Sequence, residues 1–262
     1  MPIDRRRRNR ASDGSLDWSK SWRRLCSIFV VYPGAPPFGA ALVRTKPIKV
    51  LPGQWAALPA GTWPPGFAAL PVNANGSIYV TRTDVFQVAA ISVATPNALN
   101  YERLMLAAAA WGAGTRSRSV KRAMRPWTGA GPAAPTPGTA LAAAAAALAA
   151  GGAVAAYASL LSSGANYVKY LGPAFFTKFL YFVGYGQIHP GPDPLILDSY
   201  VARGLTRLIG IGGANPWVLS LANAGWSTSQ YGAYLAWAAG EAALGVVTSA
   251  EEAEYRVWLH GK

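Results

Sequence analysis

Cysteine and histidine are nearly absent from this chain of 262 residues. Cys26 is the only cysteine, which excludes an internal disulfide framework and a metal site of several thiolates, and is compatible with a reducing cytoplasm. His189 and His260 are the only histidines and lie far apart in the sequence, which argues against a paired-histidine metal helix and a Ser-His-Asp triad. A GxxxxGK(S/T) phosphate-binding loop is also missing. We therefore expect no metal site.

Acidic residues are scarce as well. The chain has 11 of them against 24 lysines and arginines, a formal net charge of +13. Residues 1–24 hold eight of the basic and three of the acidic residues, so the remaining 16 basic and 8 acidic residues leave the rest of the chain basic too. This excess indicates a polyanionic partner, either nucleic acid or an acidic membrane surface.

The first 31 residues are interpreted as a basic tail without stable structure and a short amphipathic helix, in which Trp18 and Trp22 are one turn apart. A twin-arginine export signal and a non-specific DNA tether remain alternatives. The apolar run Leu25–Tyr32 is far too short to span a bilayer. Residues 32–74 are rich in Pro and Gly and predict an irregular extension around a main domain of residues 75–262.

The stretch TRSRSVKRAMRPW is the densest basic run outside the tail, and we expect Pro126 to end it. A solvated charged face is one interpretation. Contact with DNA phosphates is the other, because serines alternate with the arginines and also donate hydrogen bonds to phosphate. The run contains Arg116, Arg118, Lys121, Arg122 and Arg125, of which the first four are the candidate DNA contacts.

Residues 128–137, rich in Pro, Gly and Ala, predict a linker. The alanine-rich stretch that follows is long enough to suggest a membrane span. Alanine is only weakly apolar, however, and Gly151 and Gly152 interrupt the run. We expect a pair of helices packed inside the domain instead.

The stretch YLGPAFFTKFLYFVG predicts the hairpin of a helix-hairpin-helix over about residues 158–184. We expect a first helix to end near Leu171, a tight turn at Gly172 and Pro173, and a buried second helix from about Ala174. Such a hairpin offers backbone N–H groups and the positive end of a helix to a DNA phosphate. Gly172, Pro173 and Ala174 are therefore candidate DNA contacts.

Lys178 lies in this buried helix with no acidic residue near it in the sequence. A lysine whose stem crosses an apolar surface is one interpretation. The other is a reactive amine, because burial among aromatic groups favours the neutral form and is expected to bring the pKa down toward neutrality.

Asp198 follows a loop rich in Pro and Gly and opens the segment DSYVARGLTRLIG, where it is a good N-cap residue. Val201, Leu205, Leu208 and Ile209 share one face at helical spacing, so the helix is expected to pack inward and to hold Asp198 in place. A carboxylate at a helix N-terminus is favoured in its ionised form. An ordinary capping role is compatible with a catalytic one.

The segment GPAFFTK, followed twenty residues after its lysine by the aspartate of PLILDSYVA, resembles the helix-hairpin-helix DNA glycosylases of the 8-oxoguanine DNA glycosylase type, most closely bacterial proteins of that fold. The resemblance covers about residues 167–208, is weaker over 84–127 and is absent before Asn75. It implies an all-α, two-lobed fold, with Lys178 as the nucleophile that attacks the sugar and Asp198 as the catalytic carboxylate.

Two departures from that family concern the hairpin and the base pocket. The usual hairpin reads Leu-Pro-Gly-Val-Gly before Thr-Lys, whereas this chain has two phenylalanines before its Thr-Lys pair, so the glycines are displaced. The usual 8-oxoguanine contacts are not matched. Phe175 and Phe182 are the weakly indicated base-pocket residues.

We expect a DNA glycosylase that excises a damaged or modified base from double-stranded DNA, with Schiff-base (AP lyase) chemistry and no cofactor. Repair and defence against phage DNA with modified bases are both compatible with this chemistry. The protein is expected to act as a monomer in the cytoplasm, associated with the nucleoid and not with a membrane. The alternatives are a non-catalytic helix-hairpin-helix DNA-binding protein and a membrane-surface protein that uses its basic, Trp-containing start.

Overall fold

The computed structural model describes residues 40–129, 137–209 and 226–262. The predicted basic tail and most of the predicted linker lie outside these residues. The described elements are α2 (Ala40–Thr45), β1 (Ile48–Val50), the 3-10 helix η1 (Pro52–Trp55), α3 (Pro65–Ala68), β2 (Ile78–Val80), α4 (Arg82–Ala94), α5 (Ala98–Ala113), α6 (Ser117–Thr128), α7 (Pro137–Leu160), α8 (Pro173–Gly184), α9 (Ser199–Ile209), α10 (Thr228–Ala243) and α11 (Ala250–Gly261). The predicted all-α fold is confirmed.

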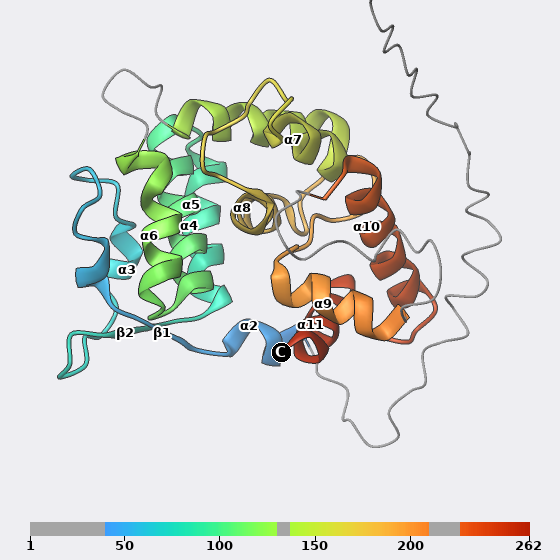
Figure 1. Cartoon of the computed structure of the whole chain (residues 1–262), viewed down its shortest axis with the longest axis horizontal. Helices are drawn as coiled ribbons and strands as arrows, with labels where there is room; N and C mark the ends of the chain where they lie inside the picture. The colour runs from blue at the N-terminus through green and yellow to red at the C-terminus, as the bar shows by residue number, and fades with distance from the viewer. Residues whose placement is uncertain (1–39, 130–136, 210–225) are drawn as a thin grey trace, which may run out of the picture. The chain divides into compact units, whose positions relative to one another are not determined.

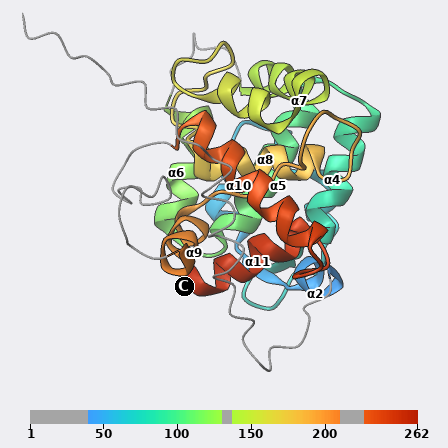
Figure 2. The ribbon, with the colours of Figure 1, turned by 90° about the vertical axis from the view of Figure 1, so that its right-hand side faces the viewer.

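Helix α8 lies at the centre of the described helices (Figure 1). It contacts α4, α5 and α7, while α9 and α10 pack on α11. Figure 2 shows α10 and α11 in front of α8 in the turned view. Residues from Phe176 to Gly184 are all buried, so α8 has no solvent-facing side beyond its first turn. The apolar sequence of this helix follows from that position.

The segment before residue 75 is more ordered than the predicted irregular extension. Strands β1 and β2 pair antiparallel, with Lys49 opposite Tyr79. Val50, Trp55 and Phe67 are buried in the core. The described residues belong to one compact unit. This corrects the predicted boundary at residue 75, because the apolar residues scattered between the prolines and glycines are enough to anchor the segment.

Helix α7 contains the interruption that its glycines predict. Gly152 has φ 79° and ψ −179°, which divides α7 into two helices. Among the described residues, α7 is long and apolar enough by length and composition alone to cross a membrane. Each of its two halves is shorter than the roughly 20 residues that a spanning helix needs. The predicted pair of alanine-rich helices is confirmed.

The connection before α8 differs from the predicted tight hairpin. No helix ends near Leu171; α7 ends at Leu160, and residues 161–172 form a series of turns. Asn166 N–H donates to the carbonyl of Ser159 at 2.8 Å, which folds the chain back over the end of α7. The two helices of the motif are therefore present, but a longer connection joins them.

Pro126 also lies where the sequence did not place it. The sequence predicted that Pro126 ends the basic run. In the structure it is inside α6, which continues to Thr128. The last turn survives because the Gly129 N–H donates to the Arg125 carbonyl at 2.9 Å. Loss of one backbone donor near a helix end is tolerated more easily than in a helix centre.

Candidate active site

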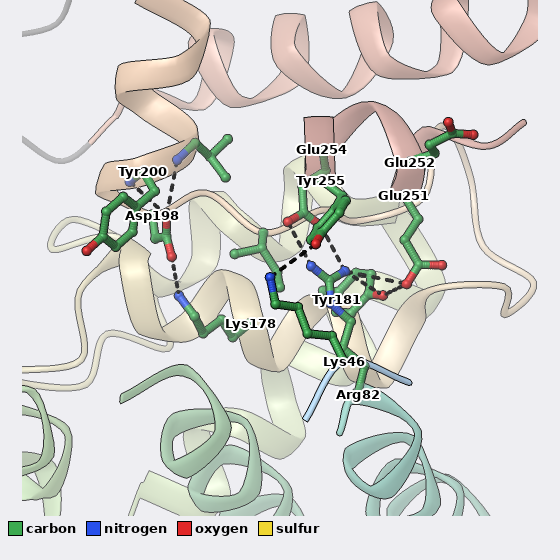
Figure 3. A network of polar contacts seen from close by, with 12 residues as sticks. Lys46, Arg82, Lys178, Tyr181, Asp198, Tyr200, Glu251, Glu252, Glu254 and Tyr255 are labelled. Carbon is green, nitrogen blue, oxygen red and sulfur yellow. Dashed lines mark hydrogen bonds and ion pairs between the residues drawn. The ribbon is translucent and has the colours of Figure 1, made fainter. Parts of the chain in front are cut away.

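Lys178 and Asp198 meet in the structure. Nζ of Lys178 lies 3.1 Å from Oδ2 of Asp198 and donates a second hydrogen bond to the Ala174 carbonyl at 2.8 Å. The Lys178 residue is 6% exposed, whereas the Asp198 side chain is 18% exposed. Figure 3 shows the two side chains pointing toward each other from α8 and from the start of α9. The pair is therefore buried at the amine and partly open at the carboxylate.

Asp198 is held in place by the backbone of α9. Its Oδ1 accepts hydrogen bonds from the N–H groups of Tyr200 at 2.9 Å and Val201 at 3.2 Å, as an N-cap residue does. This leaves Oδ2 for Lys178. Burial would raise the pKa of Asp198, but the Lys178 ammonium and the two N–H donors together lower it below its usual value. Asp198 is thus kept as a carboxylate next to the amine.

Space for the Lys178 side chain is made by a glycine of α5. A Cβ atom on Gly112 would lie 2.6 Å from Lys178 Cε and 2.9 Å from Cδ, closer than real Cβ contacts. Gly112 itself is exposed. The sequence alone does not identify Gly112, because no sequence pattern shows that α5 packs against α8.

Thr177 connects the lysine helix to the segment that precedes Asp198. Its hydroxyl donates to the Pro173 carbonyl at 2.7 Å and accepts the Leu197 N–H at 3.0 Å, and the residue is fully buried. The hydroxyls of Tyr231 and Tyr234 donate to the carbonyls of the two residues before Leu197, at 2.9 and 3.1 Å. Hydroxyl groups from α8 and α10 thus fix the backbone that leads into Asp198.

A pocket of about 290 Å³ lies at the start of α8, and several predicted DNA contacts line it. Its lining consists of Arg122, Arg125, Tyr170, Gly172, Pro173, Ala174 and Phe175. The Arg125 guanidinium lies 4.2 Å from the centre of the Tyr170 ring. The N–H groups of Phe175 and Phe176 donate to the Gly172 carbonyl, so the arginines of α6 carry much of the positive character of this pocket.

The other candidate contacts are spread along α6. Arg118 and Lys121 are exposed but do not line this pocket. Arg116, the residue before α6, donates to the Tyr200 hydroxyl at 2.8 Å, close to Asp198. The basic helix therefore passes both the start of α8 and the start of α9.

The two predicted base-pocket residues have different environments. Phe175 lines the pocket at the start of α8. Phe182 is only 2% exposed and packs edge-on against Phe86 and Trp111, with ring centres 5.0 and 5.6 Å apart. We therefore correct the assignment of Phe182: it is a core residue, and a base could stack on it only after its neighbours moved.

A second polar cluster, which the sequence analysis missed, is buried beside the first (Figure 3). Arg82 donates to Glu254 at 3.1 and 3.2 Å and to Glu251 at 3.4 Å, and the Tyr181 hydroxyl donates to Glu251. Burial, together with repulsion from Glu251 and Asp198, outweighs the attraction of Arg82 and raises the pKa of Glu254 to about 7. This cluster connects α4, α8 and α11.

Within the described ranges, no group of three or more His, Cys, Asp or Glu side chains is arranged to hold a metal ion. At the site itself, an amine and a carboxylate are in contact. Such a pair can supply a nucleophile, a proton acceptor and a negative charge to a reacting carbon.

In the comparison with protein families, a family described as "Putative 8-oxoguanine DNA glycosylase OGG-like protein" matches residues 41–258. The match begins well before Asn75, where the resemblance was expected to be absent, and agrees with the ordered packing of residues 40–74. Comparison with curated proteins and with solved structures gave no match.

Proposed function

Because the chain belongs to the OGG-like family of 8-oxoguanine DNA glycosylase relatives, whose match covers residues 41–258 of 262, we propose that it is a DNA glycosylase with its active site at Lys178 and Asp198. The substrate would be duplex DNA that contains a damaged or modified base. The observation that carries this proposal is the 3.1 Å contact between the buried amine and the carboxylate that caps α9.

The chemistry assigns a distinct role to each side chain. Breaking the bond between the base and C1′ sends the bonding electrons to the base and builds positive charge on the sugar, which the Asp198 carboxylate stabilises. Lys178 must give up a proton before Nζ can bond to C1′, and Asp198 is within hydrogen-bond distance to accept it. Opening of the sugar ring with loss of a second amine proton would then leave a Schiff base.

The fate of the Schiff base decides whether the protein is also a lyase. Hydrolysis returns Lys178 and an abasic site. Removal of a proton from C2′ instead expels the 3′ phosphate and nicks the strand, which is the AP lyase reaction. Both outcomes use the same covalent intermediate, so we propose the second as an additional activity.

DNA binding is proposed to use the pocket at the start of α8 and the basic face of α6. Arg122 and Arg125 would contact phosphate oxygens, while Gly172 to Phe175 would let the backbone approach closely. Such contacts are independent of sequence, as expected for a protein that searches DNA for an altered base. The altered nucleotide would have to leave the stack to reach the buried amine.

Borohydride reduction with duplexes that contain either a modified base or an abasic site tests the proposal. We expect a covalent adduct with the wild type and none with Lys178→Gln. Lys169→Gln, which removes an exposed lysine near the α8 pocket, is the control and should form the adduct normally. Release of a base without any trapped adduct would remove the lyase step and leave a monofunctional glycosylase. DNA binding with neither release nor adduct would instead favour the non-catalytic DNA-binding protein.

The base itself is identified by a panel of duplexes with different altered bases, read by mass spectrometry of the released nucleobases. Oxidised guanine as the released base would support a repair role. Release of bulky modified bases, with unaltered and oxidised bases left in place, would support defence against foreign DNA.

A further inference from the structure

Four cationic side chains and three aromatic rings gather beside Asp198, outside the pocket at the start of α8. We call this set the Tyr200 cluster. It consists of Lys46, Arg116, Tyr200, Arg203, Tyr255, Trp258 and Lys262. The members come from four separate parts of the chain, so the sequence alone does not indicate the cluster.

Tyr200 is at the centre. The guanidinium carbons of Arg203 and Arg116 lie 4.6 and 5.5 Å from the centre of its ring, and Arg116 also donates to its hydroxyl. Trp258 meets Tyr200 with the ring centres 6.1 Å apart. Nζ of Lys262 lies 3.9 Å from the centre of the Trp258 ring, and Nζ of Lys46 lies 5.0 Å from the same centre. The rings thus hold the cations close together.

Close packing of α9 on α11 creates this arrangement. A Cβ atom on Gly204 would lie 1.8 Å from the Val257 carbonyl oxygen, and one on Gly261 would lie 1.7 Å from the Tyr200 carbonyl oxygen. Only glycine fits at these two positions. The two glycines let the helix backbones touch, which brings Trp258 next to Tyr200.

The cationic side chains of the cluster have no Asp or Glu partner in the part of the chain that the structure describes. Among the described residues, no carboxylate lies within ion-pair distance of Lys46, Arg116, Arg203 or Lys262, whereas Arg44, Arg82 and Arg256 are all paired. Burial and the nearby Lys46 and Arg116 charges lower the pKa of Lys262. The Nε atom of Arg203 is buried without a hydrogen-bond partner. Such a grouping of like charges is what an anionic ligand would stabilise.

The position of the cluster points to one anion. The Tyr200 N–H donates to Oδ1 of Asp198, so the cluster begins next to the proposed reaction centre. From Arg116, the residue before α6, to Arg125 in the pocket at the start of α8, the rise along the helix is about 14 Å. A single DNA strand could therefore follow α6 and contact both basic regions.

We infer that the Tyr200 cluster binds the DNA phosphate next to the extruded nucleotide. The inference rests on the proposed function and adds a second phosphate site, close to Asp198, to the one at the start of α8. The aromatic rings orient the cations, and Arg116 and Arg203 make the phosphate contacts. Lys46 and Lys262 add charge from the side of Trp258.

Salt-dependent binding tests this inference without any chemistry. The probe is a duplex with a tetrahydrofuran abasic analogue, which has no base to release and no aldehyde to trap. For Arg116→Gln and Arg203→Gln, the slope of log K against log salt concentration should each fall by about 1, and for the double variant by about 2. Lys49→Gln removes an exposed charge from β1, outside the cluster, and should leave the slope unchanged. On an undamaged duplex the losses should be smaller.

Unchanged slopes in both arginine variants would overturn the inference. Equal losses on the abasic and undamaged duplexes would overturn the placement beside the extruded nucleotide. If Arg203→Gln does not fold, as judged by its thermal melt, Lys46→Gln replaces it and should still lower the slope. Failure of the proposed chemistry can be distinguished from failure of this inference. If the wild type forms no borohydride adduct but the variants show these slope changes, the phosphate site is supported and only the lyase activity is contradicted.

Discussion

The backbone of Gly112 in α5 lies directly against the side chain of Lys178 in α8, with Cε 2.6 Å from the place where a Cβ atom would stand. The proposed nucleophile thus depends on the absence of a methyl group on a neighbouring helix. A methyl group on Gly112 would press on the stem whose Nζ holds the hydrogen bonds to Ala174 and Asp198.

Gly112→Ala should therefore impair the chemistry while sparing the fold. Alanine stabilises a helix by roughly 0.5–1 kcal/mol relative to glycine, so α5 itself should not be weakened. The added methyl group should displace Nζ from Asp198 and slow borohydride trapping at least tenfold. Gly240→Ala in α10 is the matched control, since nothing lies within 4 Å of its Cβ position. Wild-type trapping by Gly112→Ala would show that Lys178 has another route to the sugar.

Thr177 should act as a positioning residue. Thr177→Val keeps the shape of the side chain but leaves the Leu197 N–H without its acceptor, at a cost of about 1–3 kcal/mol. We expect kcat for base release to fall several-fold with little change in KM for DNA, because Thr177 is fully buried and does not itself line the pocket at the start of α8. Thr177→Ser should restore most of the activity. A purely structural role would lower the melting temperature to the same extent but leave kcat unchanged.

Asp198 offers a way to separate its charge from its capping role. Asn is as good an N-cap as Asp, so Asp198→Asn should keep the hydrogen bonds to Tyr200 and Val201 while it removes the negative charge. We expect kcat to fall about 100-fold or more and the melting temperature to change little. Asp198→Ala loses the cap as well and should melt earlier, by a further ~1 kcal/mol. Normal kcat in Asp198→Asn would contradict the catalytic role.

The location of the candidate site could be predicted because its two members carry local signals. Lys178 stands out as a charge in an apolar helix, and Asp198 precedes an amphipathic helix as its cap. The hairpin was predicted less accurately, because the length of the connection between α7 and α8 depends on where α7 ends. Helix α7 ends at Leu160, and Tyr170 has a positive φ of 71°. Residue preferences do not predict a positive φ for tyrosine.

The partners of these two residues could not be predicted. Gly112, Thr177 with Leu197, and Arg82 with Glu254 come together only through tertiary packing of distant segments. Phe182 was misassigned for the same reason: an aromatic residue near a proposed active site can equally be core, and only the positions of Phe86 and Trp111 decide. The ordered packing of residues 40–74 was missed because prolines and glycines separate its few buried side chains.

The buried cluster around Glu254 should make the stability of the protein depend on pH. The pKa of Glu254 is about 7 in the folded protein, against an ordinary value of 4.5. The folded state therefore binds this proton more tightly than the unfolded state. The resulting stabilisation is fully present below pH 4.5 and is lost as the pH rises through about 7, by up to about 3 kcal/mol.

Glu254→Gln should remove that dependence, because the amide stays neutral at every pH. Between pH 5 and about 7.5, the free energy of unfolding from urea titrations should fall less steeply for the variant than for the wild type. Glu252→Gln is the control on the same helix. The Thr248 and Arg256 side chains outweigh its burial and lower the pKa of Glu252, so its contribution is lost as the pH falls, and the slope near neutrality should be unchanged. If Glu254→Gln keeps the wild-type slope, Arg82 holds Glu254 ionised throughout and the network is a permanent ion pair.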